Sequence, residues 1–123
     1  MGVNILGTGG YVPSNVVDNE MMSRIVDTND EWITTRTGIK QRCITNGETT
    51  WYMGTMAAKA AVENAGISPE DIGLIIDTTI TPDFTTPSVS CFIQRELGAV
   101  GAACLDINAA CSGFVYGMDM AMR

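Results

Sequence analysis

Short continuous runs of apolar residues predict the strands of this chain. They lie at 3–6, 39–44, 73–80 and 102–108, each bounded by glycines or polar residues. The run at 74–76 is apolar at every position, which is typical of a sheet covered on both faces. Glycines within 7–10 predict a turn, but their spacing and the following Pro13 do not fit a dinucleotide-binding loop.

Between these runs, apolar residues recur at helical spacing. The helices predicted in this way are 15–26, 29–37, 49–65, 87–97 and 109–122, with one capped turn at 68–71. Glycines at 38, 66 and 98 end three of them. Thr28 and Glu31 form a capping box for the second helix, and Thr86 is a candidate N-cap for the fourth. Alanines in 49–65 favour close packing against a neighbour.

The order of these elements predicts an α/β fold with a mostly parallel sheet and helices on both faces. The last helix, 109–122, is apolar nearly all round and is interrupted only by Asp119. Such a helix is typical of a large core or an interface. Because the sequence stops at Arg123, we expect the elements that cover this helix to belong to a longer protein.

Composition excludes several classes of protein. The 123 residues are 46% hydrophobic and 17% charged, which suits one folded domain. The net charge of −7, from 7 basic and 14 acidic residues, argues against a nucleic-acid surface. No apolar run is long enough to span a bilayer, and no signal-peptide pattern is present, so we expect a cytoplasmic protein without a membrane partner.

One of the four cysteines is a candidate nucleophile. There is no C-x-x-C pair among them and no His in the chain, so zinc-site spacing is absent and no metal is predicted. Cys111 lies among small residues between a predicted strand and the last helix. The helix dipole favours a thiolate there, and N–H groups at the turn suit an oxyanion. The alternative is an inert buried thiol, and the residues alone leave both open.

A second candidate site contains Trp32 and Arg36. They are four residues apart, so a helix places them on one face. An aromatic plane beside a guanidinium suits a nucleotide, with stacking on the base and charge on a phosphate. The alternative is a core tryptophan with an unrelated surface arginine.

The segment 106–117, DINAACSGFVYG, resembles the active-site cysteine segment of the β-ketoacyl-acyl-carrier-protein synthase III family of condensing enzymes. The segment 28–39, TNDEWITTRTGI, is a second marked match, and 5–13 and 63–71 are further ones. The resemblance covers essentially all 123 residues in order. It implies that 1–123 is the N-terminal half of a thiolase-like fold, truncated after the catalytic-cysteine helix.

The resemblance implies an acyltransferase of dissociated fatty-acid synthesis, homodimeric as a whole enzyme. Cys111 would take an acyl group from acyl-coenzyme A as a thioester, which would then condense with malonyl-acyl-carrier protein as carbon dioxide is lost. Coenzyme A thioester is a substrate, and no cofactor is implied. The family's catalytic His and Asn lie in its C-terminal half, so we expect the 123-residue chain alone to be inactive.

The resemblance also assigns binding residues. Trp32 and Arg36 would lie at the mouth of the coenzyme A tunnel, with Thr28 contacting the base and Thr37 as a further candidate. Thr86 stands where the best-known members carry a Phe that crosses the dimer interface and closes the partner's acyl pocket. A smaller Thr predicts tolerance for longer or branched primers, unless Thr86 is only an N-cap.

Two other functions stay open from the sequence. One is a related thiolase-fold starter-unit synthase of the polyketide or alkylquinolone type, although the Trp32 and Arg36 motif favours synthase III. The other is a non-catalytic fragment that dimerises through the apolar helix 109–122. Acylation of Cys111 by acyl-coenzyme A separates an enzyme from such a fragment.

Overall fold

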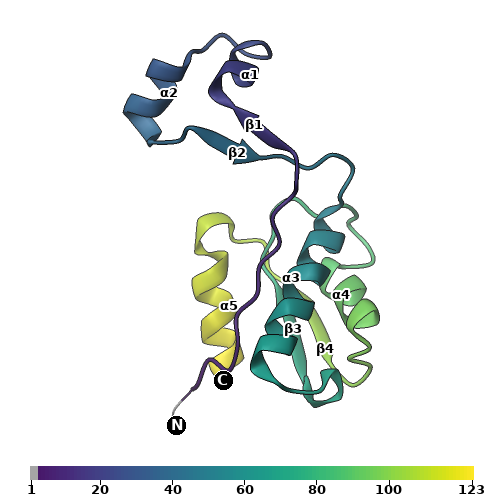
Figure 1. Ribbon diagram of the computed structural model, residues 1–123. Helices are drawn as coiled ribbons and strands as arrows, with labels where there is room; N and C mark the ends of the chain where they lie inside the picture. The colour runs from purple at the N-terminus through teal and green to yellow at the C-terminus, as the bar shows by residue number, and fades with distance from the viewer. Residues whose placement is uncertain (1–2) are drawn as a thin grey trace. The chain divides into compact units, whose positions relative to one another are not determined.

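The computed structural model describes residues 3–123, which form two compact units (Figure 1). Residues 12–48 form one unit, with β1 (Val16–Asp18), α1 (Asn19–Ser23), α2 (Asp30–Thr37) and β2 (Gln41–Cys43). Residues 3–11 and 49–123 form the other. It contains α3 (Thr50–Ala65), the 3-10 turn η1 (Pro69–Asp71), β3 (Leu74–Asp77), α4 (Val89–Leu97), β4 (Ala103–Asp106), the 3-10 turn η2 (Ala110–Ser112) and α5 (Gly113–Met122).

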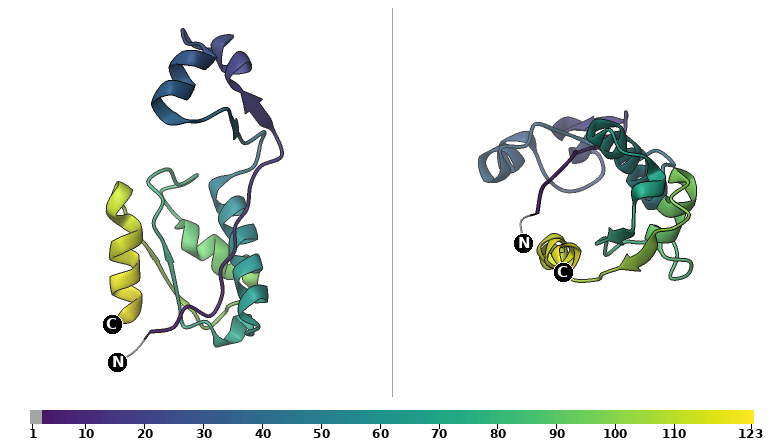
Figure 2. Two further views of the ribbon diagram at one scale, coloured as in Figure 1. Left: turned by 60° about the vertical axis from the view of Figure 1, so that its left-hand side comes forward. Right: turned by 90° about the horizontal axis from the view of Figure 1, so that it is seen from below.

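The larger unit is built around the parallel pair of β3 and β4, in register from Leu74 beside Ala103 to Asp77 beside Asp106. Helix α4 covers one face of this pair and α5 lies against the other, as Figure 2 shows. Adjacent residues of a strand point to opposite faces. The predicted α/β arrangement with helices on both faces is confirmed in this unit. Its core consists of Ile75, Val89, Ile93, Ala99 and Ala102.

Helix α3 begins and ends where the sequence predicts. The Thr49 side chain accepts a hydrogen bond from the Tyr52 N–H, and Gly66 ends the helix with a left-handed φ of 66°. The predicted turn after it is also present, because the side chains of Ser68 and Asp71 form a reciprocal capping box. Local cap chemistry therefore determines both boundaries.

The predicted strand at 3–6 is wrong. These residues form no strand, and Ile5 and Leu6 are exposed. The chain instead runs alongside α3 (Figure 1), where Thr8 donates its backbone N–H to Asn64 Oδ1 at 3.0 Å. Among the described residues this segment pairs with no strand, and an apolar run alone does not create a ladder.

Glycine at position 9 allows the N-terminal segment to approach the backbone of α3. A Cβ on Gly9 would lie 2.3 Å from Ala57 O and 2.3 Å from Ala61 N. The predicted close packing of the alanine-rich helix is thereby confirmed. We expect Gly9→Ala to lower the free energy of unfolding by about 2 kcal/mol. The new methyl group would clash with two backbone atoms of α3, and neither can move without distorting the helix. Urea denaturation measures this loss.

Gly10→Ala provides the matched control for Gly9→Ala. No heavy atom lies within 4 Å of a Cβ built on Gly10, so this substitution is expected to change the unfolding free energy by less than about 0.5 kcal/mol. Equal effects at Gly9 and Gly10 would show that the segment does not pack on α3 as described.

The smaller unit differs from the prediction at its start. The helix predicted over 15–26 is a strand, β1, followed by the five-residue helix α1. Strand β1 pairs antiparallel with β2, so the strand predicted within 39–44 is present and has a partner. Long-range pairing determines the conformation of 16–18, and helical spacing of apolar residues contains no information about it.

Helix α5 is less buried than predicted for an apolar helix. It meets β3 and the residue that follows this strand through two glycines. A Cβ on Gly113 would lie 3.0 Å from Thr78 Cβ, and one on Gly117 would lie 3.6 Å from Ile76 Cγ2. Only these two of its residues are buried, and Phe114 is 71% exposed. Within the described residues α5 has protein on one face only, so its other apolar side chains are uncovered. No helix among residues 3–123 is both long and apolar enough to cross a membrane.

Candidate active site and nucleotide pocket

Cys111 lies on a tight turn between β4 and α5. Strand β4 ends at Asp106, the 3-10 turn η2 holds Ala110 to Ser112, and α5 begins at Gly113. Ala110, directly before the cysteine, has φ of 45°, and it is the single described non-glycine residue with a positive φ. Such a sharp, strained turn between a strand and a helix presents the following side chain outward. Within the described residues Cys111 is exposed, which differs from the buried thiol of the alternative interpretation.

The other three cysteines have different surroundings. Cys91 and Cys104 are partly buried, and burial is the main cause that raises the pKa of Cys104, with the Cys91 thiol as a further cause. The Ser88 hydroxyl donates to the Cys91 sulfur at 3.1 Å. Cys43 is exposed, but it lies on strand β2 rather than before a helix. Among the described cysteines, Cys111 alone combines exposure with a position ahead of a helix.

The carboxylate of Asp106 fixes the strand end from which the cysteine turn departs. It accepts hydrogen bonds from the backbone N–H groups of Val89 at 2.8 Å and Ser90 at 3.0 Å. A negative charge there also complements the positive end of the α4 dipole. Ser88 is the N-cap residue of α4 but makes no side-chain cap bond, so the prediction of Thr86 as the cap is wrong.

Asp77 lies beside Asp106 at the ends of the two parallel strands. Burial raises the pKa of the Asp77 carboxyl, the negative charge of Asp106 raises it further, and a hydrogen bond from the Thr79 N–H opposes both. The ionised form of Asp77 therefore costs free energy in the fold. The protonated carboxyl contributes stability below the ordinary carboxyl pKa. This contribution is lost as the pH rises from that value through the raised pKa of Asp77 in the folded protein.

A pocket of about 380 Å³ opens beside the end of β4. Phe84 stands at this pocket and packs against Phe92, with ring centroids 5.7 Å apart. Neither Cys111 nor Thr86 is among the lining residues. Thr86 is exposed and precedes Pro87 by a cis peptide bond. The lining residues are Thr79, Ile80, Pro82, Phe84, Thr85, Ser88, Asp106, Ile107 and Asn108.

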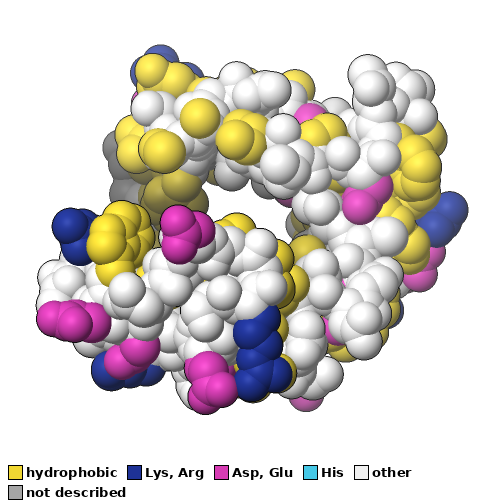
Figure 3. Space-filling view, turned by 90° about the horizontal axis from the view of Figure 1, so that it is seen from above, with side chains coloured by type: hydrophobic (Ala, Val, Ile, Leu, Met, Phe, Trp, Pro, Cys, Tyr) yellow, Lys and Arg dark blue, Asp and Glu magenta, His cyan; other side chains and the backbone are white. Residues whose placement is uncertain are grey.

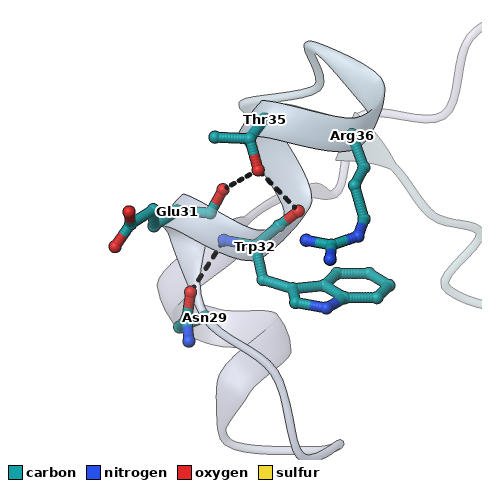
Figure 4. A pocket seen from close by; sticks show the side chains of 5 residues that line it. All are labelled: Asn29, Glu31, Trp32, Thr35 and Arg36. Atoms are coloured by element: carbon teal, nitrogen blue, oxygen red, sulfur yellow. Dashed lines mark hydrogen bonds between the residues drawn. The ribbon is translucent and has the colours of Figure 1, made fainter.

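Helix α2 presents Trp32 and Arg36 on one face, as predicted. The Arg36 guanidinium carbon lies 4.5 Å from the centroid of the indole ring, and Trp32 is 52% exposed (Figure 4). The core-tryptophan alternative is therefore wrong. A pocket of about 270 Å³ surrounds this pair and is lined by Asn29, Glu31, Trp32, Thr35 and Arg36. A half-exposed indole beside a guanidinium offers an aromatic face and a positive charge within one pocket.

The other predicted nucleotide contacts lie outside this pocket. Asn29, not Thr28, caps α2, because Asn29 Oδ1 accepts from the Trp32 N–H at 2.8 Å. The predicted capping box of Thr28 and Glu31 is therefore wrong, and a simple N-cap lies one position later. The Thr28 hydroxyl oxygen is buried and has no hydrogen-bond partner among the described residues. Thr37 uses its hydroxyl locally, donating to Ile33 O at 2.7 Å and accepting from the Ile39 N–H.

On one face of the molecule, charged groups are dispersed rather than gathered into a stripe (Figure 3). On the face drawn in Figure 3, Lys and Arg side chains stand apart from one another, with Asp and Glu between them. The four described ion pairs are all at the surface, and Arg36 belongs to none of them. The contact described for the Arg36 guanidinium is the one with the Trp32 ring.

Comparison with known proteins shows which enzymes this chain is similar to. No protein-family model matches the chain. The β-ketoacyl-[acyl-carrier-protein] synthase III of Clostridium botulinum (strain Langeland) is 54% identical over 119 residues, which are 97% of this chain and 36% of that protein. The crystal structure of 3-oxoacyl-[acyl-carrier-protein] synthase III from Aquifex aeolicus VF5 is 53% identical, with a TM-score of 0.94 over 98% of this chain and 39% of its own. The chain is a homologue of part of β-ketoacyl-[acyl-carrier-protein] synthase III.

The relationship to synthase III confirms the family recognised in the sequence and the thiolase-like fold. The priming β-ketosynthase of the R1128 polyketide biosynthetic pathway is also similar, at 40% identity and a TM-score of 0.92 over 96% of this chain and 36% of its own. The chain spans about a third of the length of these synthase III relatives, 36% of the Clostridium protein.

Proposed function

We propose that this chain is the acyl-accepting part of a synthase III of fatty-acid synthesis, with Cys111 as its nucleophile. The observation that carries the proposal is the exposed Cys111 on a strained turn directly before α5, in a chain 54% identical to synthase III. A thiol held there meets the positive end of the helix dipole, which favours attack on an acyl carbonyl.

The proposed reaction has two steps at one sulfur atom. The Cys111 sulfur attacks the thioester carbonyl of acyl-coenzyme A, a new carbon–sulfur bond forms, and coenzyme A leaves as its thiol. Malonyl-acyl-carrier protein then loses carbon dioxide, and the resulting carbanion attacks the acyl-cysteine carbonyl. The Cys111 thiolate leaves, and the product is a β-ketoacyl-acyl-carrier protein. Backbone N–H groups at the turn are candidates for stabilising the oxyanion of each attack.

We assign the nucleotide end of coenzyme A to the α2 pocket. The exposed face of the Trp32 indole would stack on the base, and the Arg36 guanidinium would meet a phosphate. Thr28 and Thr37 are weaker candidates, because neither lines the pocket. The chain has no His, so the His that decarboxylation of the malonyl group requires in this family lies outside these 123 residues. We propose that the complete enzyme is a cytoplasmic homodimer and that the chain alone is inactive.

The test is a condensation assay with the complete protein that contains this chain. Acetyl-coenzyme A and malonyl-acyl-carrier protein are supplied, and the acyl-carrier protein is analysed by mass spectrometry. The proposal predicts β-ketoacyl-acyl-carrier protein together with release of one carbon dioxide per product. A complete protein that accepts no acyl group from coenzyme A would refute this proposal and favour the alternative of a non-catalytic, dimerising chain.

A starter-unit synthase is the second candidate function, favoured by the 40% identity to the R1128 priming β-ketosynthase. Thr86 bears on this choice, because the family resemblance implies that its side chain would lie at the partner's acyl pocket. We expect the complete enzyme to use branched and medium-chain acyl-coenzyme A primers as well as acetyl-coenzyme A. We expect Thr86→Phe to lower kcat/KM for those larger primers by roughly tenfold, because a ring fills the space that Thr leaves.

Acetyl-coenzyme A serves as the internal reference for Thr86→Phe. Its kcat/KM is expected to change less than about threefold, since a two-carbon acyl group does not reach the enlarged space. A strict acetyl preference in the unsubstituted enzyme would refute this assignment of Thr86 and would leave the proposal for Cys111 unaffected.

A further inference from the structure

Asn19 is the most deeply buried polar side chain of the 12–48 unit, at 2% exposure. Its Nδ2 donates to Asp30 Oδ1 at 2.7 Å and to Ile39 O at 2.8 Å, with a longer contact of 3.4 Å to Thr34 Oγ1. Its Oδ1 accepts from the Arg42 guanidinium at 2.6 Å. One amide thus connects the start of α2, its second turn, its exit and strand β2.

Helix α2 has little apolar packing to hold it in place. Of its eight residues only Ile33 is buried. The polar contacts from Asn19 therefore carry much of the placement of α2. The Asp30 carboxylate that anchors this network also accepts from Lys40 at 3.0 Å. Hydrogen bonds from Asn19, Lys40 and Thr34 lower the pKa of Asp30 to about 2, so the carboxylate remains ionised well below neutral pH.

The face of α2 that Asn19 holds is opposite the face that carries the nucleotide pocket. Asp30 and Thr34 precede Trp32 and Arg36 by two positions each. Two positions correspond to a rotation of about 200° in an α-helix. Any shift or rotation of α2 caused by loss of the Asn19 contacts would therefore displace the indole and the guanidinium together.

We infer that Asn19 is a positioning residue for the nucleotide end of acyl-coenzyme A. Its amide fixes α2 against β2, so that the pair of Trp32 and Arg36 is already arranged before the nucleotide binds. A preorganised site loses less conformational freedom on binding, and small displacements of such groups are costly. This inference rests on the proposed coenzyme A site of synthase III.

Asn19→Asp in the complete enzyme tests this inference. The new carboxylate oxygen would stand in place of Nδ2, 2.7 Å from the Asp30 oxygen, and would repel it. We expect KM for acetyl-coenzyme A to rise roughly tenfold with kcat changed less than about twofold. The acetyl thioester of N-acetylcysteamine, which has no nucleotide, should react with unchanged kcat/KM. Asn19→Asp with Asp30→Asn should lower KM for acetyl-coenzyme A again, because an amide then donates to a carboxylate at the same contact.

Trp32→Ala separates failure of the inference from failure of the proposed site. A raised KM for acetyl-coenzyme A in Trp32→Ala, but not in Asn19→Asp, would overturn the role of Asn19 alone. Equal losses with both acyl donors in Asn19→Asp would also overturn it, since a merely structural residue affects both. If Trp32→Ala leaves KM for acetyl-coenzyme A unchanged, the α2 pocket is not the coenzyme A site. That result would refute both the proposed site and the role of Asn19. Asn19→Ser, which introduces no charge, replaces Asn19→Asp if that variant does not fold, with the same expected changes in KM for acetyl-coenzyme A and in kcat/KM for the nucleotide-free thioester.

Discussion

Cys111→Ala is expected to abolish β-ketoacyl-acyl-carrier-protein formation by the complete enzyme. The rate should fall by about 10³-fold or more, because removal of a covalent nucleophile eliminates the acyl-enzyme path rather than weakening it. The side chain is exposed and forms none of the described hydrogen bonds, so the fold should be unaffected. The rate of product formation and the thermal unfolding midpoint, measured on one preparation, check both expectations.

Cys43→Ala is the matched control for Cys111→Ala. Both cysteines are exposed, but Cys43 lies on β2 and is not followed by a helix. We expect Cys43→Ala to keep its activity within about twofold of the unsubstituted enzyme. Loss of activity in Cys43→Ala with activity retained in Cys111→Ala would move the nucleophile to the other unit and refute the proposed mechanism.

Asp106→Ala should give the largest loss of stability among the substitutions considered. It removes both carboxylate bonds to the α4 amino end, and the freed N–H groups of Val89 and Ser90 are buried with no replacement acceptor. Bonds to a charged group contribute about 1.5–3 kcal/mol each, so we expect a loss of about 3 kcal/mol. Urea denaturation of the complete protein measures it.

Two further variants separate the capping role of Asp106 from a general effect of charge. Asp106→Asn keeps one carboxamide oxygen at the helix end and should lose about 1 kcal/mol. Asp119→Ala removes an exposed carboxylate that pairs with Arg123 four residues later, and should change the unfolding free energy by less than about 0.5 kcal/mol. If all three variants lose the same free energy, the helix-capping account of Asp106 is wrong.

Local sequence signals predicted where helices end better than they predicted which residues the helices contact. Glycines at 66 and 98 end α3 and α4 with left-handed φ values of 66° and 75°, as glycine after a helix indicates. The cap of α2 was misplaced by one residue, because Thr28 and Asn29 are both cap-forming types and only the folded backbone selects Asn29.

Long-range contacts had no signal in the sequence. Asn19 lies between two acidic residues and resembles a surface position, yet its bonds reach residues 11 to 23 positions later. Asp106 is 16 and 17 positions from the amides that it caps. The strand predicted from the apolar run at 3–6 is absent for a related reason. Strand formation depends on a partner strand that the run itself does not specify.

The candidate site was predictable to the extent that it is local. A strand, small residues and a helix around Cys111 identified the turn, and a spacing of four identified the face shared by Trp32 and Arg36. The positive φ of Ala110 and the pocket beside β4 arise from backbone geometry and from segments distant in sequence. No residue pattern encodes either feature by itself.

Peptide mapping of the acylated enzyme tests the central claim most directly. The complete protein is incubated briefly with acetyl-coenzyme A, quenched, digested and analysed by mass spectrometry for the acetyl group on each of its cysteines. We predict acetyl on the peptide that contains Cys111, and none on the peptides that contain Cys43, Cys91 or Cys104. Acetyl on another cysteine, or none on Cys111 while product still forms, would contradict the assignment.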